Sequence, residues 1–127
     1  MSILINDVAD YLQAQGVGTV ATNIFSGYLP ESPDACIAVL DTGGPQPDAY
    51  LPTRSPTFQV FIRDIDYPTG KAKLDSVRAK LHQNANVALV SGQTYFYYIL
   101  AISEGGHVGR DDAGRDLFSI NFLCKTR

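Results

Sequence analysis

The sequence predicts an α+β fold, in which a mostly antiparallel sheet of four to five strands carries two helices on one face. The stretch Thr57–Arg63 alternates along the chain and places Phe58, Val60 and Ile62 on one side, as a half-buried central strand does. Helical spacing occurs once before the strand-like segments and once among them, which is typical of α+β proteins rather than of alternating β–α–β units. A chain of 127 residues is expected to form one domain, residues 1–127.

The first helix is predicted over Ser2–Gln15. Apolar side chains recur there every four residues and therefore share one helical face: Leu4, Val8 and Leu12. Ser2 is suited to capping the first turn, and Gly16 to ending the last one.

A second helix is predicted to open at Pro68 and Thr69 and to run to about Gln83, with Asn84–Asn86 ending it. Its apolar stripe consists of Leu74, Val77 and Leu81. The outward positions carry the main local concentration of basic side chains: Lys71, Lys73, Arg78 and Lys80. Such a set is usually a solvated face, and a weak phosphate contact is the alternative.

Two further strands are predicted before the central one. Asn23–Leu29 is a short apolar candidate, and Ala35–Asp41 alternates around Ile37 and Val39. Between them, Pro33 and Asp34 favour a turn, because proline presets φ and aspartate bonds its own backbone. We therefore expect these strands to form a hairpin across Pro30–Asp34.

The longest irregular stretch is expected at Thr42–Pro56, which contains two glycines and four prolines. Proline cannot donate to a strand ladder, so a central strand is disfavoured there. Long loops in small domains are usually functional or mobile. The apolar residues Tyr50 and Leu51 either tuck back onto the domain or contact a partner, and the sequence leaves both open.

Two strands are predicted after the second helix. Tyr95–Ile102 is apolar on both faces, Tyr95 and Tyr97 included, so it is either covered on both sides or placed at a subunit contact. Leu117–Cys124 alternates more cleanly, and its expected inward residues are Phe118, Ile120, Phe122 and Cys124. The segment Ser103–Arg115 between them is expected to be a turn-rich hairpin connection, in which Arg110 and Arg115 flank an acidic turn.

Composition limits the classes of function. The formal net charge is −3 and the pI about 5.1, which argues against a protein that wraps duplex DNA or coats a membrane surface, yet permits a ring through which DNA passes. Cys36 and Cys124 are expected to be buried free thiols. No apolar run approaches the length of a membrane span, and no signal peptide is recognisable, so we expect synthesis in the cytosol.

No residue pattern indicates catalysis, a cofactor or a metal. His82 and His107 are expected to be a structural and a surface histidine. The acidic turn Asp111–Gly114 lacks the alternating ligands and final glutamate of a calcium loop, and the glycine-rich Gly105–Gly109 lacks the Lys-Ser/Thr of a phosphate loop. We predict no catalytic, cofactor-binding or metal-binding residue. A small-molecule-binding or enzymatic α+β domain is the alternative of another class, and it would need a concave pocket with converging polar groups.

Three blocks together resemble the minor capsid or tail terminator proteins of long-tailed bacteriophages. The first runs from Asn23–Pro30 through Pro33–Asp34 to Asp41–Gly44, the second is Pro56–Arg63 followed by Tyr67, and the third is Gly109–Arg115 closing in Phe118–Phe122. The likeness extends over nearly the whole chain, and its specificity lies in the combination and order of the blocks.

The resemblance implies a structural protein of the virion. Terminators of this kind form a ring, commonly a hexamer, which caps the tail tube protein, stops its growth and faces the head–tail connector, while DNA passes through the lumen without specific binding. A head-closure or neck protein is the alternative within the virion. No membrane partner is implied. Candidate interaction residues are Tyr50, Leu51, Tyr95, Tyr97, Arg110 and Arg115.

Overall fold

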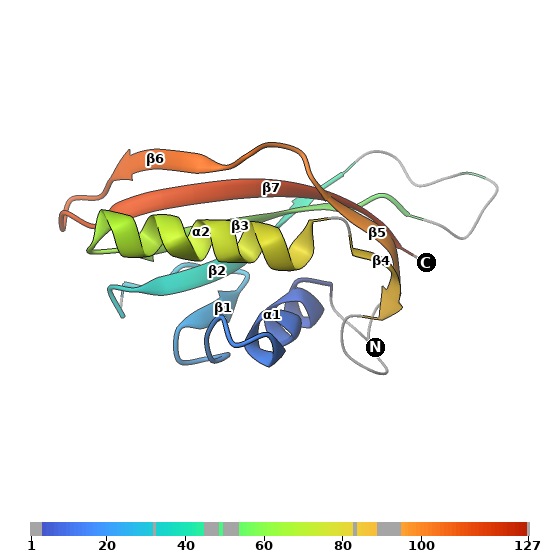
Figure 1. Cartoon of the computed structure of the whole chain (residues 1–127), viewed down its shortest axis with the longest axis horizontal. Helices are drawn as coiled ribbons and strands as arrows, with labels where there is room; N and C mark the ends of the chain where they lie inside the picture. Colours follow the sequence, from blue (N-terminus) through green and yellow to red (C-terminus); the bar gives the residue numbers. More distant parts are fainter. Residues whose placement is uncertain are drawn as a thin grey trace.

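The computed structural model describes residues 4–31, 33–44, 49, 54–82, 84–88 and 95–126, and every structural statement below refers to them. They form two helices and seven strands (Figure 1). In chain order these are α1 (Leu4–Ala14), β1 (Ile24–Ser26), β2 (Cys36–Gly43), β3 (Thr57–Asp64), α2 (Tyr67–Leu81), β4 (Asn84–Ala88), β5 (Tyr95–Ala101), β6 (Gly106–Arg110) and β7 (Asp116–Thr126).

All seven strands belong to one sheet. Its main path runs β1-β2-β3-β7-β5-β4, and β6 pairs with β7 beside that path. Only the β1–β2 pair is parallel. β5 and β6 share one edge of β7, because β5 pairs with its C-terminal half and β6 with its N-terminal end. The α+β class and the mainly antiparallel sheet are therefore confirmed, with more strands than the predicted four to five.

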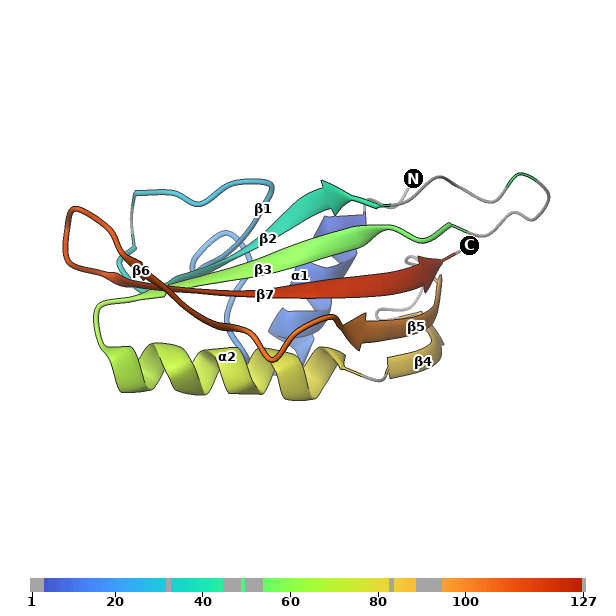
Figure 2. The same ribbon diagram turned by 90° about the horizontal axis from the view of Figure 1, so that it is seen from above.

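Both helices pack on the same face of the sheet, as predicted. α1 contacts β1 and β2, and α2 contacts β3, β5, β6 and β7. Figure 2 shows α1 behind the strands and α2 running alongside them on the β5–β6 side. The two helices meet where the Tyr11 hydroxyl donates to the Lys80 carbonyl at 3.2 Å. A single hydrophobic core results, because the buried residues of both helices and of this sheet face form one cluster.

The predicted central strand is confirmed. β3 lies between β2 and β7, and Phe58, Val60 and Ile62 are fully buried against the helices. The expected inward set of β7 is also buried: Phe118, Ile120, Phe122 and Cys124. Both helical stripes are confirmed too, since Val8 and Leu12 of α1 lie in the core together with the α2 set Leu74, Val77 and Leu81.

The hairpin predicted across Pro30–Asp34 is wrong. β1 runs parallel to β2, with Ile24 opposite Ile37 and Ser26 opposite Val39. A parallel pair needs the chain to return to the starting end of the first strand. The segment after β1 does this, and the arginine contacts described below hold it at the end of the sheet. The local preference of Pro33–Asp34 for a turn therefore does not decide the direction of pairing.

Two segments predicted as non-strand are strands. Asn84–Asn86, expected to end the second helix, opens β4, because the helix already ends at Leu81 and His82 has extended backbone angles. Ser103–Arg115, expected to be a connection, contains β6. Gly105 makes this path possible: its φ is +80°, and a Cβ there would lie 2.9 Å from the Cβ of Ile120.

Candidate functional site

In the described chain, no helix packs on the face of the sheet opposite α1 and α2, and the segment between β1 and β2 lies over this face at Arg63. In β5, Phe96 and Ile99 are in the core, with an irregularity of register between Phe96 and Tyr98. Leu100, the next residue, points to the open face, where it pairs with Leu123. The strand predicted to be apolar on both faces is thus covered on one side only.

Three exposed apolar residues follow each other along this edge, and we call them the β5–β6 stripe: Leu100, Ile102 and Val108. Their exposures are 38%, 59% and 58%. Single exposed apolar side chains are normal, whereas a run of them on one edge is typical of a surface that another protein covers.

Two buried arginines hold the segment between β1 and β2 to the sheet. Arg63 of β3 donates from Nη2 to the Pro33 carbonyl at 2.7 Å and from Nε to the Asp34 carbonyl at 3.3 Å. Arg115 donates from Nη1 to the Glu31 carbonyl at 2.5 Å and forms an ion pair with the Asp34 carboxylate at 3.3 Å. Charged donors on backbone carbonyls are strong and directional, so this arginine pair fixes the return path of the parallel connection.

The acidic turn before Arg115 is confirmed as turn chemistry. Asp111 Oδ1 accepts from the backbone N–H groups of Ala113 and Arg115, and its Oδ2 accepts from Arg115 Nε at 2.7 Å. The hydrogen bond from the Arg115 backbone lowers the pKa of Asp111, and the Arg115 guanidinium lowers it further. Burial acts to lower the pKa of Arg115, but the carboxylates of Asp111, Glu31 and Asp34 together outweigh it and leave that pKa raised.

A second polar cluster lies where β6 meets β7. Asp116 is buried, and its Oδ1 binds both His107 Nε2 and Arg110 Nε at 3.0 Å. Burial acts to raise the pKa of Asp116, but the hydrogen bonds from His107 and Arg110 outweigh it and hold the pKa below its usual range. The His107 ring also packs on Phe118 and Tyr67. These contacts to Asp116 anchor β6 to β7.

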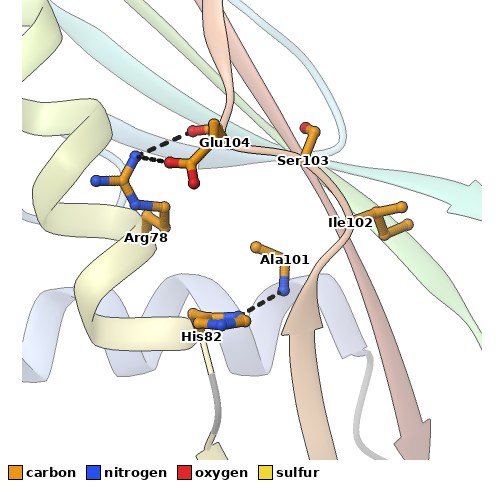
Figure 3. A pocket seen from close by; sticks show the side chains of 6 residues that line it. All are labelled: Arg78, His82, Ala101, Ile102, Ser103 and Glu104. Atoms are coloured by element: carbon orange, nitrogen blue, oxygen red, sulfur yellow. Dashed lines mark hydrogen bonds and ion pairs between the residues drawn. The ribbon is translucent and has the colours of Figure 1, made fainter.

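A shallow groove of about 420 Å³ lies between the end of α2 and the β5–β6 connection (Figure 3). His82 Nδ1 accepts the backbone N–H of Ala101 at 3.0 Å. Arg78 binds both the carbonyl and the carboxylate of Glu104, at 3.1 and 3.2 Å. These contacts of His82 and Arg78 attach the β5–β6 connection to the end of α2.

The predicted interaction residues are distributed over several places. Tyr50 and Leu51 lie outside the described residues. Tyr95 belongs to β5, and Tyr97 of the same strand is half-buried. The Arg110 side chain is 66% exposed, and that of Arg115 only 7%. Of the candidates that the structure describes, Arg110 and Arg115 flank the β6–β7 turn. They remain predicted interaction residues, with Arg115 turned into its own subunit.

Sequence reasoning missed the buried role of Arg63 and the β5–β6 stripe. Arg63 occupies an outward position of the alternating strand, which signals a surface residue unless a loop folds over it. The stripe was hidden because Val108 lies in a glycine-rich segment. Both cysteines are buried free thiols, as expected. Among the described residues, no three His, Cys, Asp or Glu side chains gather as metal ligands, and no helix is long and apolar enough to span a membrane.

Comparison with known proteins assigns this chain to a family. Among solved structures, a chain of one described as the virion of a native gene transfer agent (GTA) particle is similar, with a TM-score of 0.71 at 14% identity, over 97% of this chain and 93% of that chain. At this identity the likeness concerns the fold. Curated protein sequences give no match. The family described as bacteriophage tail terminator protein matches residues 11–127. Because the match spans nearly the whole chain, this protein belongs to the bacteriophage tail terminator family, a family of structural phage proteins.

Proposed function

We propose that copies of this protein close into a ring, a hexamer, which caps the finished tail tube, stops its growth and presents a surface to the head–tail connector. The observation that carries the proposal is the family match over residues 11–127. The protein is made in the host cytoplasm, acts as one domain over its whole length, and ends in the virion.

The exposed surface supports a ring. A closed ring needs a heterologous contact, in which two different patches of the subunit meet. The β5–β6 stripe supplies one apolar patch, and Tyr97 and Arg110 belong to the same two strands, β5 and β6. Burying such side chains between subunits contributes roughly 25 cal/mol per Å² of apolar surface. Tyr50 and Leu51, in the loop predicted at Thr42–Pro56, are the second candidate patch.

The proposed role requires no bond to be made or broken. Binding energy comes from complementary surfaces of identical copies and of the tube and connector proteins. A net charge of −3 suits a channel through which DNA passes without specific binding, because a basic surplus would retain the phosphates. An enzymatic reading would need converging polar groups, whereas Arg78 and Glu104 in the groove neutralise each other.

Polymerisation of the tail tube protein in vitro tests this function. Purified tube subunits are allowed to polymerise with and without this protein, and tube lengths are measured by electron microscopy. We expect added protein to shorten the length distribution and to appear as a ring at one tube end. Light scattering of the protein alone should give a mass well above that of the 13.8 kDa subunit, or one that rises with concentration.

Two variants sharpen the test. Leu100→Ser/Ile102→Ser removes two side chains of the stripe and should weaken both the ring and the arrest of growth. Ser103→Ala, an exposed change in the same connection, should behave as the wild type. Tubes that grow to full length at saturating wild-type protein would contradict a terminator, and binding to the connector without arrest would instead identify a neck protein.

A further inference from the structure

The charges of this chain are divided between its two halves. The first 53 residues contain six of the thirteen acidic residues and no lysine, arginine or histidine. All ten lysines and arginines, with seven acidic residues, follow from Arg54 onward. The overall charge of −3 thus conceals an acidic half and a basic half.

The fold places the strands of these halves at opposite edges of the sheet, while α1 and α2 meet at Tyr11 and Lys80 on its inner face. The first half forms α1, β1 and β2, at one edge of the sheet. α2 and β4–β6 form the other edge, with β3 and β7 between them, as Figure 2 shows. We call these the α1–β2 side and the α2 side. The described residues of the α1–β2 side include five acids and no base, whereas α2 alone carries four bases and one acid.

Ion pairs within the subunit neutralise part of this charge, but the two sides still differ in charge. Arg115 reaches across to Glu31 and Asp34, and Lys73 pairs with Asp64. On the α1–β2 side, Asp10 is half-exposed and Asp41 exposed. On the α2 side, Lys71 and Arg78 share the single acid of the helix, Asp75, at 3.4 and 3.3 Å, and Arg78 also pairs with Glu104 at 3.2 Å.

The α1–β2 side and the α2 side each carry exposed apolar side chains in addition to their charges. The α2 side carries the β5–β6 stripe, and the α1–β2 side carries Tyr28, which is 57% exposed and packs on Phe25 with ring centroids 5.5 Å apart. Interfaces between proteins commonly combine an apolar centre with a charged rim whose signs are complementary.

We propose that the α1–β2 side of one copy binds the α2 side of the next, so that the subunits join head to tail. The inference rests on the proposed ring and names its contact surfaces. A face-to-face contact between two α2 sides, or two α1–β2 sides, would bring like charges together, whereas the head-to-tail contact pairs opposite charges at every junction. In the head-to-tail arrangement, every junction also uses the same two surfaces, as a closed ring requires.

A charge-swap experiment tests the proposal. The first variant, Asp10→Lys/Ala14→Lys, makes the α1–β2 side basic at the C-terminal end of α1. The second, Lys71→Glu/Ala72→Glu, makes the α2 side acidic near the N-terminal end of α2. Each pair follows the helix macrodipole, which favours cations at the end of a helix and anions at its beginning, so the fold is preserved. Circular dichroism of each variant confirms this before assembly is measured.

Each variant alone should assemble about tenfold more weakly than the wild type in low salt, because every junction then joins like charges. An equimolar mixture should recover assembly, since the basic α1–β2 side of one variant fits the acidic α2 side of the other. High salt screens these charges, so the wild type and the variants should then assemble with similar strength. The control Arg54→Glu/Ala113→Glu changes the net charge as much as the second variant, at exposed positions away from both helices, and should assemble normally.

The outcomes separate the two proposals. A wild type that forms the ring, with variants that each assemble equally well, would overturn these contact surfaces and leave the ring standing. Variants that fail alone and also fail as a mixture would overturn them as well, because the two sides would then not be partners. A wild type that never exceeds a dimer, even at tube ends, would overturn both the surfaces and the ring.

Discussion

Strands β3 and β7 present different chemistry on their two faces. On the face toward the helices, Phe58 and Phe122 are fully buried and stack with ring centroids 5.1 Å apart. On the other face, the neighbouring Gln59 and Leu123 are half-buried and Asn121 is exposed. The same strands therefore supply both a completed core and an uncovered surface. At these positions we therefore expect substitutions on the inner face to cost more stability than substitutions on the outer face.

The largest expected effect comes from opening the inner face. Phe122→Ala removes one ring of the stacked pair and leaves a cavity that Phe58 cannot fill alone. We expect the free energy of unfolding to fall by about 3–5 kcal/mol, the range for truncating a buried aromatic residue. Urea denaturation followed by circular dichroism measures the loss.

The next residue is the matched control. Leu123 lies on the outer face between Thr57 and Leu100, and it keeps contact with solvent. Leu123→Ala should lower the free energy of unfolding by no more than about 1 kcal/mol, because little buried volume is lost. Equal losses for the two substitutions would contradict the distinction between the faces.

The inner face is also the part of the fold that the sequence predicts best. The alternation of Thr57–Arg63 and of Leu117–Cys124, and the helical spacing of Leu74, Val77 and Leu81, are local patterns imposed by one continuous core. Each of these segments was assigned correctly, with ends shifted by a few residues. The periodicity of core-facing residues can be recognised in the sequence because all of these residues pack into the same hydrophobic core.

The rest depends on contacts between distant segments. Nothing local in Ile24–Ser26 specifies a parallel partner; that choice depends on Arg63 and Arg115 binding the carbonyls of the returning chain. β6 is glycine-rich and would not be a strand without the free edge of β7. Of the candidate site, the apolar strand was visible in the sequence, whereas the stripe and the two charged sides required the sheet order.

The second prediction tests how closely α2 packs on the inner face. Gly70 lies in α2, and a Cβ placed there would lie 2.5 Å from Cε2 of Phe118. Gly70→Ala gains helix propensity of about 1 kcal/mol but overpacks the contact. We expect a net loss of about 1–2 kcal/mol in the free energy of unfolding, measured by urea denaturation. In a Phe118→Leu background, the added methyl group should be tolerated or stabilising.

Gly106 provides the control for this glycine. It pairs with Ser119, an outer-face residue of β7, and a Cβ there would have no atom within 4 Å. Gly106→Ala should therefore be neutral or slightly stabilising, because the unfolded chain loses freedom and the folded chain meets no clash. A similar loss at both glycines would show that backbone freedom, and not the approach of α2 to Phe118, controls the effect.

The smallest expected effect concerns a thiol on each face. Cys124 lies on the inner face, and burial raises its pKa to about 12. The unfolded thiol titrates near pH 9.0, so raising the pH above this value favours the unfolded state, in which the thiolate forms. At pH 10 this thiol should cost about 1.4 kcal/mol of stability relative to pH 7. Cys124→Ala should remove that part of the alkaline loss, whatever its effect at pH 7.

Cys36 is the counterpart on the outer face, opposite Arg63 in the register. Burial raises its pKa as well, but the positive charges of Arg63 and Arg115 act against burial. Cys36→Ala should therefore flatten the alkaline limb less than Cys124→Ala does. The measurement is urea denaturation of both variants and the wild type at pH 7 and pH 10, compared as differences between the two pH values. A greater flattening from Cys36→Ala would mean that the arginines do not reach the thiol, and that the two faces differ less in electrostatics than in packing.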